Sequence, residues 1–214
     1  MFGSTGERPS IRAGWTRGVL RYYEAHREEA LVAQTLERVA DESLRAIRAL
    51  DDLEWLAIEP HVELLEALLA DLGPAEFVAL YRRASVALMR SRLLRTTAVA
   101  GVRVFGRKAI LRVLPRAWRL VVRDCGQFRV GAHPTKNCAV VTLSSMPPVI
   151  AQSQATKLCI AAMLAGACDL GGYPGRVRIA PAPAGARTFV FEVSLYGEPE
   201  YRRDQPGPPV DLGD

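Results

Sequence analysis

Long apolar runs are missing from this sequence of 214 residues. A helix that crosses a bilayer needs about 18 or more largely apolar residues. The longest candidate, residues 158–168, is short and is bounded by Lys157 and Asp169. The first 14 residues also lack the apolar segment that a secretory signal contains. These absences predict a cytoplasmic protein without a membrane span.

Cysteine and histidine are scarce. The four cysteines, Cys125, Cys138, Cys159 and Cys168, form no CxxC pair, and the three histidines lie in separate segments. Zinc sites use such ligands at short recurring spacings, so we expect no metal site. A cytoplasmic chain of this length has little need of disulfides, so we expect four free thiols.

Catalytic motifs are also missing, since the chain has neither a Gly-x-Ser-x-Gly turn nor a glycine-rich phosphate loop. An enzyme would have to use His61 or His133 as its base. His61 lies beside two glutamates, and we favour a surface histidine there over a ligand or base; His133 is expected in an exposed turn. Cys125 follows Asp124 and is more typical of a small buried residue at a strand end than of an activated thiol. We therefore expect a non-enzymatic protein without a cofactor.

Acidic residues are absent between Glu76 and Asp124, although the formal net charge of the chain is only +5. This stretch, the basic tract, predicts either a face for nucleic acid or another anion, or arginines that pair with the acid-rich residues 24–71. We favour pairing, because no docking motif or row of aromatic stacking residues accompanies the charge. Its arginines and lysine are Arg82, Arg83, Arg90, Arg92, Arg95, Arg103, Arg107, Lys108, Arg112, Arg116, Arg119 and Arg123.

Apolar residues at helical spacing fill the first half of the chain from residue 11. Glu59-Pro60 is typical of a helix start, and the apolar stripe that follows stops at Gly73, with Pro74 starting the next helix. A short helix is expected over residues 108–116. The first half is therefore predicted to be helical.

The period changes after Pro115. Alternating or β-branched segments predict strands over residues 118–123, 128–130, 138–143, 176–180 and 188–195, with a tight turn at Cys125-Gly126. A long helix is expected over residues 149–170. This order predicts an α+β fold: a helix-rich N-terminal half packed with an antiparallel sheet of about 4–5 strands and one long helix in the C-terminal half. We expect a single domain over 11–196, a frayed segment 1–10 and a disordered proline-rich tail 197–214.

The order of features from Trp55 to Leu195 resembles a paralogous protein family of myxobacteria, similar in layout to the vinyl-reductase-type, haem-NO-binding and TRAPP-like ligand-binding fold. The resemblance is carried by VELLEALLADLG, LPRAWR at 114–119, Met146-Pro147-Pro148 and the long helix that closes at Leu170-Gly171-Gly172. It implies a sheet backed by helices, often dimeric, that binds a small ligand or a protein. The haem-binding branch has a Tyr-x-Ser-x-Arg motif beside an axial histidine. Tyr81 begins YRRAS instead, so the resemblance does not extend to haem.

We therefore expect a homodimeric binding module of a bacterial regulatory or signalling system, with a small apolar ligand or a protein as its partner. The alternative is a nucleic-acid- or anion-binding protein that uses residues 82–123. The candidate binding residues are Arg103, Arg107, Lys108, Arg112, Arg116 and Trp118.

Overall fold

The computed structural model describes residues 8–90, 107–132, 138–170, 175–182 and 186–195, although for 107–112, 132 and 195 it gives the backbone alone. The elements are β1 (Ser10–Arg12), α1 (Ala13–His26), α2 (Glu29–Leu36), α3 (Asp41–Ala49), β2 (Trp55–Ala57), α4 (Ile58–Met89), α6 (Arg107–Val121), β3 (Val122–Arg123), β4 (Gln127–Ala132), β5 (Cys138–Ser144), α7 (Pro148–Ala151), α8 (Gln154–Leu170), β6 (Gly175–Ala180) and β7 (Phe189–Leu195). None of the helices in these ranges combines the length and the apolar character that crossing a membrane requires.

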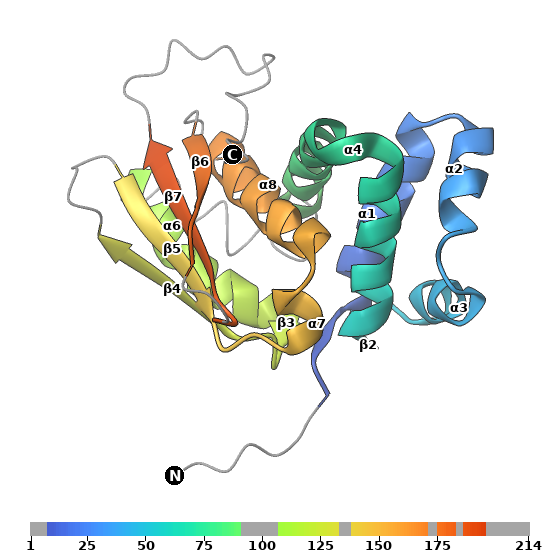
Figure 1. Cartoon of the computed structure of the whole chain (residues 1–214), viewed down its shortest axis with the longest axis horizontal. Helices are drawn as coiled ribbons and strands as arrows, with labels where there is room; N and C mark the ends of the chain where they lie inside the picture. Colours follow the sequence, from blue (N-terminus) through green and yellow to red (C-terminus); the bar gives the residue numbers. More distant parts are fainter. Residues whose placement is uncertain (1–7, 91–106, 133–137, 171–174, 183–185, 196–214) are drawn as a thin grey trace.

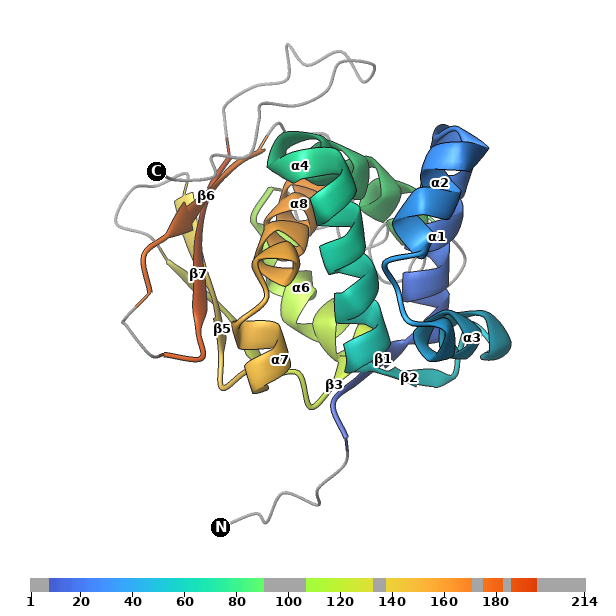
Figure 2. The same ribbon diagram turned by 45° about the vertical axis from the view of Figure 1, so that its right-hand side comes forward.

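These elements form layers. A sheet of β4, β5, β7 and β6 lies at one side, α8 packs beside it, α4 lies in the middle, and α1, α2 and α3 lie at the opposite side (Figure 1). Turning the molecule shows α6 behind α8 and α4 (Figure 2). Helices packed on an antiparallel sheet confirm the predicted α+β class.

The four-stranded sheet is antiparallel throughout, in the order β4-β5-β7-β6. Successive strand residues point to opposite faces, and in β5 the residues Ala139, Val141 and Leu143 are buried while their neighbours are not. Val141 pairs with Phe191 of β7, which is also fully buried. The strands predicted over 138–143 and 188–195 are therefore confirmed, with their apolar face turned to the helices.

A second sheet has three short strands, with β1 between β2 and β3. Ser10 pairs with Ala57 on one side and with Arg123 on the other. Ser10, which the sequence analysis assigns to a frayed N-terminus, is therefore part of a sheet. Residues 1–7 and 196–214 lie outside the described residues. The guanidinium groups of Arg12 and Arg123 lie 3.8 and 4.4 Å from the centre of the Trp55 ring, which joins the three strands further.

The predicted break at Gly73 is confirmed. Within α4, Gly73 has φ +69° and ψ 166°, a conformation that favours glycine, and Pro74 follows it. The two parts of α4 therefore meet at a bend, although the helix is continuous on either side. Since both parts carry buried apolar faces, the bend lets α4 line the core along its whole length.

Helix α6 corrects two predictions. The sequence analysis ends a helix at residue 116 and predicts a strand over residues 118–123, but α6 runs through Pro115 to Val121 and only Val122–Arg123 is a strand. Leu114, Trp118 and Val121 are four and three residues apart, so a helix places them on one face. The Trp118 ring packs 5.5 Å from that of Phe128, centre to centre. This burial outweighs the hydrogen bond that Pro115 removes.

The long helix of the C-terminal half is shorter than predicted, because α7 ends before α8 begins at Gln154. Ser153 caps α8: its Oγ accepts a hydrogen bond from the backbone N–H of Thr156 at 3.0 Å and donates to the Glu66 carboxylate of α4. The cap therefore fixes both the start of α8 and its position on α4.

Helices α4 and α8 approach closely. Arg82 of α4 donates two hydrogen bonds to the carboxylate of Asp169 in α8, both at 2.6 Å. A Cβ built on Gly166 would lie 2.6 Å from Ser85 Oγ and 3.0 Å from the Arg82 carbonyl oxygen. Only glycine allows the two helices this distance. Arg82, a member of the basic tract, is thus paired with an acid of the C-terminal half.

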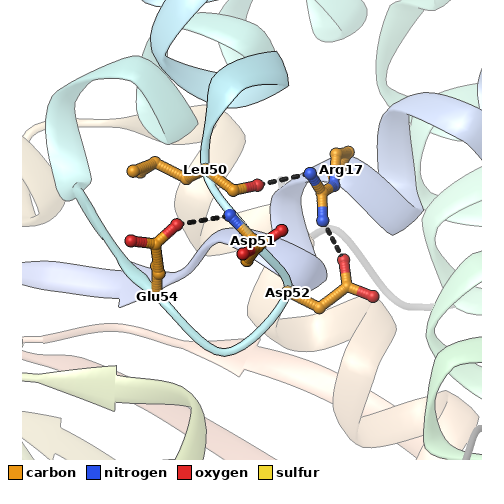
Figure 3. Close-up of polar contacts among 5 residues, drawn as sticks. All are labelled: Arg17, Leu50, Asp51, Asp52 and Glu54. Carbon is orange, nitrogen blue, oxygen red and sulfur yellow. Dashed lines mark hydrogen bonds and ion pairs between the residues drawn. The ribbon is translucent and has the colours of Figure 1, made fainter.

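The loop between α3 and β2 is held against α1. Arg17 donates hydrogen bonds to the carbonyl oxygen of Leu50 and to the Asp52 carboxylate, and Glu54 accepts one from the backbone N–H of Asp51 at 2.5 Å (Figure 3). The loop therefore fixes α1 beside the small sheet.

Candidate functional site

A cavity of about 70 Å³ lies in the core between two walls. The first wall, which we call the front wall, comes from β1, α1 and α4 and includes Ile11, Trp15, His61 and Tyr81. The second, the back wall, comes mainly from α6 and α8 and includes Leu114, Trp118, Val121, Thr156, Cys159 and Met163. The cavity therefore lies where the helical front half meets the C-terminal half.

Helical spacing aims the back-wall residues at one place. In α8, Thr156, Cys159, Ile160 and Met163 lie at steps of three, one and three residues, so they form one stripe. In α6, Leu114, Trp118 and Val121 form the matching stripe. Since α8 is buried around most of its circumference, the stripe that faces the cavity is not distinguishable from core by sequence pattern.

Polar groups of the front wall are paired with neighbours. Nδ1 of His61 lies 2.9 Å from Thr16 Oγ1. Nε1 of Trp15 donates to the Tyr81 hydroxyl at 2.8 Å, and that hydroxyl also bonds Cys159 across the cavity. The front wall is therefore held by a hydrogen-bonded network.

Burial decides how these groups titrate. It lowers the pKa of His61 to about 4, so the imidazole is neutral at pH 7. Burial raises the pKa of Tyr81 well above its ordinary value, and it raises the pKa values of Cys125 and Cys159 to about 12. A thiol reacts as its thiolate, so neither cysteine is activated. A general base works best with a pKa near the ambient pH, which His61 does not have.

Two polar atoms of the back wall are unsatisfied. Nε1 of Trp118 and Oγ1 of Thr156 are both buried, and neither has a hydrogen-bond partner among the described residues. Leaving a buried donor or acceptor unpaired costs about 1–3 kcal/mol. The two walls therefore differ, because the Trp15 indole and the Tyr81 hydroxyl of the front wall are paired, whereas the back wall has two polar atoms without a partner among the described residues.

The predicted site residues fall in different places. Arg103 lies outside the described residues. Arg107, Lys108 and Arg112 belong to α6, where the structure describes only their backbone. Arg116 is exposed on the same helix, and Trp118 lines the cavity. The prediction of a common binding surface for these six residues stays a prediction.

His61 corrects a prediction. The sequence analysis favours a surface histidine beside acids, but the side chain is 4% exposed and lines the cavity. The contact that buries His61 cannot be seen in the local sequence, because its partner Thr16 is 45 residues away in the chain. His133 lies outside the described residues. Cys125 is buried after β3, as expected for a small residue at a strand end, and all four cysteines are free.

The preferred explanation of the basic tract is pairing with the acid-rich residues 24–71, and Arg82 has a different partner. Arg82 pairs with Asp169 and not with the acid-rich residues 24–71. Within the described part of the chain, acids of the front half pair with arginines of the front half instead: Glu24 with Arg48, Asp52 with Arg17, and Glu59 with Arg8. Arg83, Arg90 and Arg119 are exposed.

Comparison with known proteins finds likeness in fold alone. No family model and no curated protein sequence matches the chain. Solved structures of H-NOX proteins match this structure, although only 10–12% of the aligned residues are identical in the three described here. The unliganded Fe(II) protein from K. algicida, in a form with a single substitution, gives TM-score 0.60 at 10% identity, over 87% of this chain and 97% of that one. The S. oneidensis protein in the Fe(II)NO state gives TM-score 0.57 at 12% identity, over 87% and 100%. The Shewanella woodyi protein in the Fe(II)CO state, with IWP-051 bound, gives TM-score 0.56 at 10% identity, over 91% and 99%.

This chain therefore has the H-NOX fold, and the cavity can be tested against haem, the group that the fold implies. His61 is neutral and has Nδ1 engaged by Thr16, which is the form an iron ligand needs. The volume does not fit, because a pocket for even a drug-sized ligand holds about 300–1,000 Å³ and this cavity holds about 70 Å³. Nor does any lysine or arginine appear among the described lining residues to pair with a haem carboxylate. As described, the site does not fit haem.

Proposed function

We propose that this protein is a non-enzymatic ligand-binding module of a bacterial regulatory or signalling system, and that it takes a small apolar molecule into the cavity between the front and back walls. The apolar cavity in the core is the observation that carries this proposal. Well-packed cores leave few voids larger than a water molecule, and dry apolar cavities bind small apolar molecules.

The position of the cavity supports a sensing role. Its walls come from both halves of the fold, so an occupant contacts α1 and α4 on one side and α6 and α8 on the other. A ligand shifts a conformational equilibrium only by its differential affinity for the two states. An occupant that moves these walls apart or together binds the two conformations with different affinities. The resulting movement of α6 changes the surface that this helix exposes to a partner.

The methionines provide the test. Met89 and Met163 line the cavity, whereas Met146 is fully buried elsewhere. With ¹³C-methyl methionine, adding the hydrocarbon methylenecyclopentane is expected to shift the resonances of Met89 and Met163 and to leave that of Met146 in place. Methionine adapts its shape to an occupant, so these methyls are sensitive reporters. No shift at either cavity methionine would contradict the proposal.

A pair of variants controls for non-specific uptake. Ala117 lines the cavity, and Ala117→Leu fills part of it; Ala70→Leu adds the same atoms to an exposed position of α4. Ala117→Leu is expected to weaken the binding of methylenecyclopentane at least about tenfold, and Ala70→Leu to leave it unchanged. Equal binding by both variants would place the hydrocarbon outside the cavity.

The homodimer, the cytoplasmic location and kinship with the myxobacterial paralogous family belong to the same proposal. The LPRAWR and Met-Pro-Pro segments support the kinship, and ligand-binding modules of this layout are often dimeric. Native mass spectrometry of the purified protein, compared with the denatured sample, tests two parts together. A dimer mass with an added small molecule that is lost on denaturation is the expected result. A monomer mass would refute the dimer, and a protein partner remains the alternative occupant of the exposed α6 surface.

A further inference from the structure

Two of the three exposed large apolar side chains in the described part of the chain lie near each other. Leu53 is 62% exposed in the loop between α3 and β2, and Leu120 is 48% exposed near the end of α6. The guanidinium group of Arg12 donates one hydrogen bond to the carbonyl oxygen of Leu53 and another to that of Leu120. Two exposed leucines that are far apart in the sequence are therefore brought together by one side chain.

The small sheet lies beside these leucines. Arg12 pairs with Trp55 across β1 and β2, and directly opposed residues of an antiparallel pair point to the same face. The guanidinium groups of Arg12 and Arg123 lie close to the Trp55 ring, which is partly exposed. Ile11 and Val122, which precede the two arginines, are buried. The outer face of the sheet therefore carries tryptophan and arginine, residue types that are enriched at the centres of protein interfaces.

The two sides of this surface carry opposite charge. On the loop side three exposed residues are acidic, namely Asp51, Asp52 and Glu54, and Asp52 pairs with Arg17 (Figure 3). On the helix side Arg116 and Arg119 are exposed beside Leu120, and neither pairs with an acid among the described residues. We call the outward-facing side chains of residues 51–55 and 116–123, together with Arg12, the mixed-charge patch.

The mixture of charges selects the partner. A nucleic acid or an anionic membrane carries charge of one sign, so the acidic loop would repel it. A uniformly acidic protein would meet the same repulsion. A second copy of this chain brings both signs. When it is turned about a two-fold axis, its helix end faces the acidic loop of the first copy and its acidic loop faces the helix end of the first. This arrangement also buries the exposed leucines of both copies.

We infer that this protein forms a two-fold symmetric homodimer through the mixed-charge patch, with the acidic loop of each protomer against the end of α6 in the other. The inference deepens the proposed function and rests on its homodimer, because it names the surface that joins the two copies. It also places the dimer contact next to the cavity, since Val121 and Val122 line the cavity and Leu120 and Arg123 flank them in the patch.

Two charge reversals at exposed positions test the pairing. Asp51→Arg and Arg119→Glu each set like charges against each other in the dimer, so each variant alone is expected to dimerise at least about tenfold more weakly than the unaltered protein. Sedimentation velocity over a range of concentrations measures the dissociation constant. An equal mixture of the two variants is expected to form a heterodimer, because the reversed loop of one meets the reversed helix end of the other. Native mass spectrometry distinguishes this heterodimer by its mass.

The leucines test the apolar part of the contact. Leu53→Glu and Leu120→Glu each place a charge where the dimer excludes water, so each is expected to weaken dimerisation at least about tenfold. Leu31→Glu is the matched control, because Leu31 is the third exposed leucine and lies on α2. It is expected to leave the dissociation constant unchanged. Thermal unfolding of each variant checks that the protomer still folds, as the exposure of these positions implies.

A heterodimer in the mixture would support the inference, because no effect within a single protomer can restore assembly between two weakened variants. If each reversal weakens the dimer and the mixture does not restore it, the loop of one copy does not contact the helix of the other, and the inference is wrong. A dimer that tolerates all four patch variants would also overturn it and would leave the homodimer in place. An unaltered protein that stays monomeric at roughly millimolar concentration would refute the homodimer and this inference together. The response of the cavity methionines to methylenecyclopentane decides the ligand proposal separately.

Discussion

The contact between α4 and α8 and the cavity between the walls are only a few residues apart along α8, yet they are built in opposite ways. In the contact, Arg82 and Asp169 pair and Gly166 removes the last space between the helices. In the cavity, space remains and Trp118 and Thr156 leave polar atoms unpaired. The contact is therefore closely packed and its charges are paired. The cavity combines open space with unpaired polar groups, and the open space is the basis of the proposal that it binds a ligand.

Breaking the ion pair of the contact is expected to have the largest effect. The side chains of Arg82 and Asp169 are 10% and 20% exposed, and removing one partner of a buried pair costs about 3–5 kcal/mol. Arg82→Ala should therefore lower the free energy of unfolding by about 3 kcal/mol, measured in urea. Arg178→Ala breaks a pair whose arginine is 54% exposed and should cost less than about 1 kcal/mol. Equal losses of unfolding free energy in the two variants would show that the Arg82–Asp169 pair contributes no more to stability than an exposed ion pair.

The burial of His61 in the front wall can be tested by the pH dependence of the free energy of unfolding. Its pKa falls from 6.5 to about 4 on folding, so the unfolded state binds the proton more readily and stability decreases as the pH falls from 6.5 to 4. The loss attributable to this side chain is about 3 kcal/mol at pH 4. Urea unfolding at pH 7 and pH 4.5 measures it. His61→Gln should flatten the dependence, whatever its stability at pH 7.

The close approach at Gly166 sharpens the comparison. Alanine is a better helix former than glycine by about 1 kcal/mol, but its Cβ would lie 2.6 Å from Ser85 Oγ. Gly166→Ala is therefore expected to destabilise the protein by about 2 kcal/mol through overpacking. In Gly131→Ala the nearest atom to the new Cβ is 3.8 Å away, and a change within about 0.5 kcal/mol is expected. A stabilising Gly166→Ala would mean that the helices separate easily.

The smallest effect is expected in the cavity, and with the opposite sign. Thr156→Val removes an unsatisfied hydroxyl and should leave stability unchanged or raise it by up to about 1 kcal/mol. Thr35→Val removes a hydroxyl that bonds Tyr23 at 2.8 Å and the Leu31 carbonyl oxygen at 2.9 Å, and should cost about 1–3 kcal/mol. Thermal unfolding of both variants measures the difference. A similar loss in both would mean that the Thr156 hydroxyl is satisfied after all.

Sequence pattern predicted most of the elements, and its errors have a physical cause. The strands β5 and β7 and the break at Gly73 depend on alternation and on glycine conformation, which are local. The segment from Trp118 to Arg123 was predicted wrongly, because Trp118, Leu120 and Val122 fit the period of a strand, whereas Leu114, Trp118 and Val121 fit that of a helix. Packing of Trp118 on Phe128 selected the helix.

The cavity was beyond such prediction. Trp15 and Tyr81 are 66 residues apart, and Thr16 and His61 are 45 apart. Sequence periodicity does not predict that these pairs are in contact. Nor does it distinguish a tryptophan packed in the core from one that lines a cavity. Trp118 was named as a candidate binding residue, but the cavity that it lines could not be inferred from its position in the sequence.

The sequence by itself determined the fold class and the positions of most helices and strands, because each follows from local conformational preference. The tertiary structure alone decided that His61 is buried and neutral, that Arg82 pairs with Asp169, and that Trp118 and Thr156 border one cavity. These depend on which surfaces meet when α4, α6 and α8 pack, and dehydration and pairing at such contacts act between residues that are far apart in the chain.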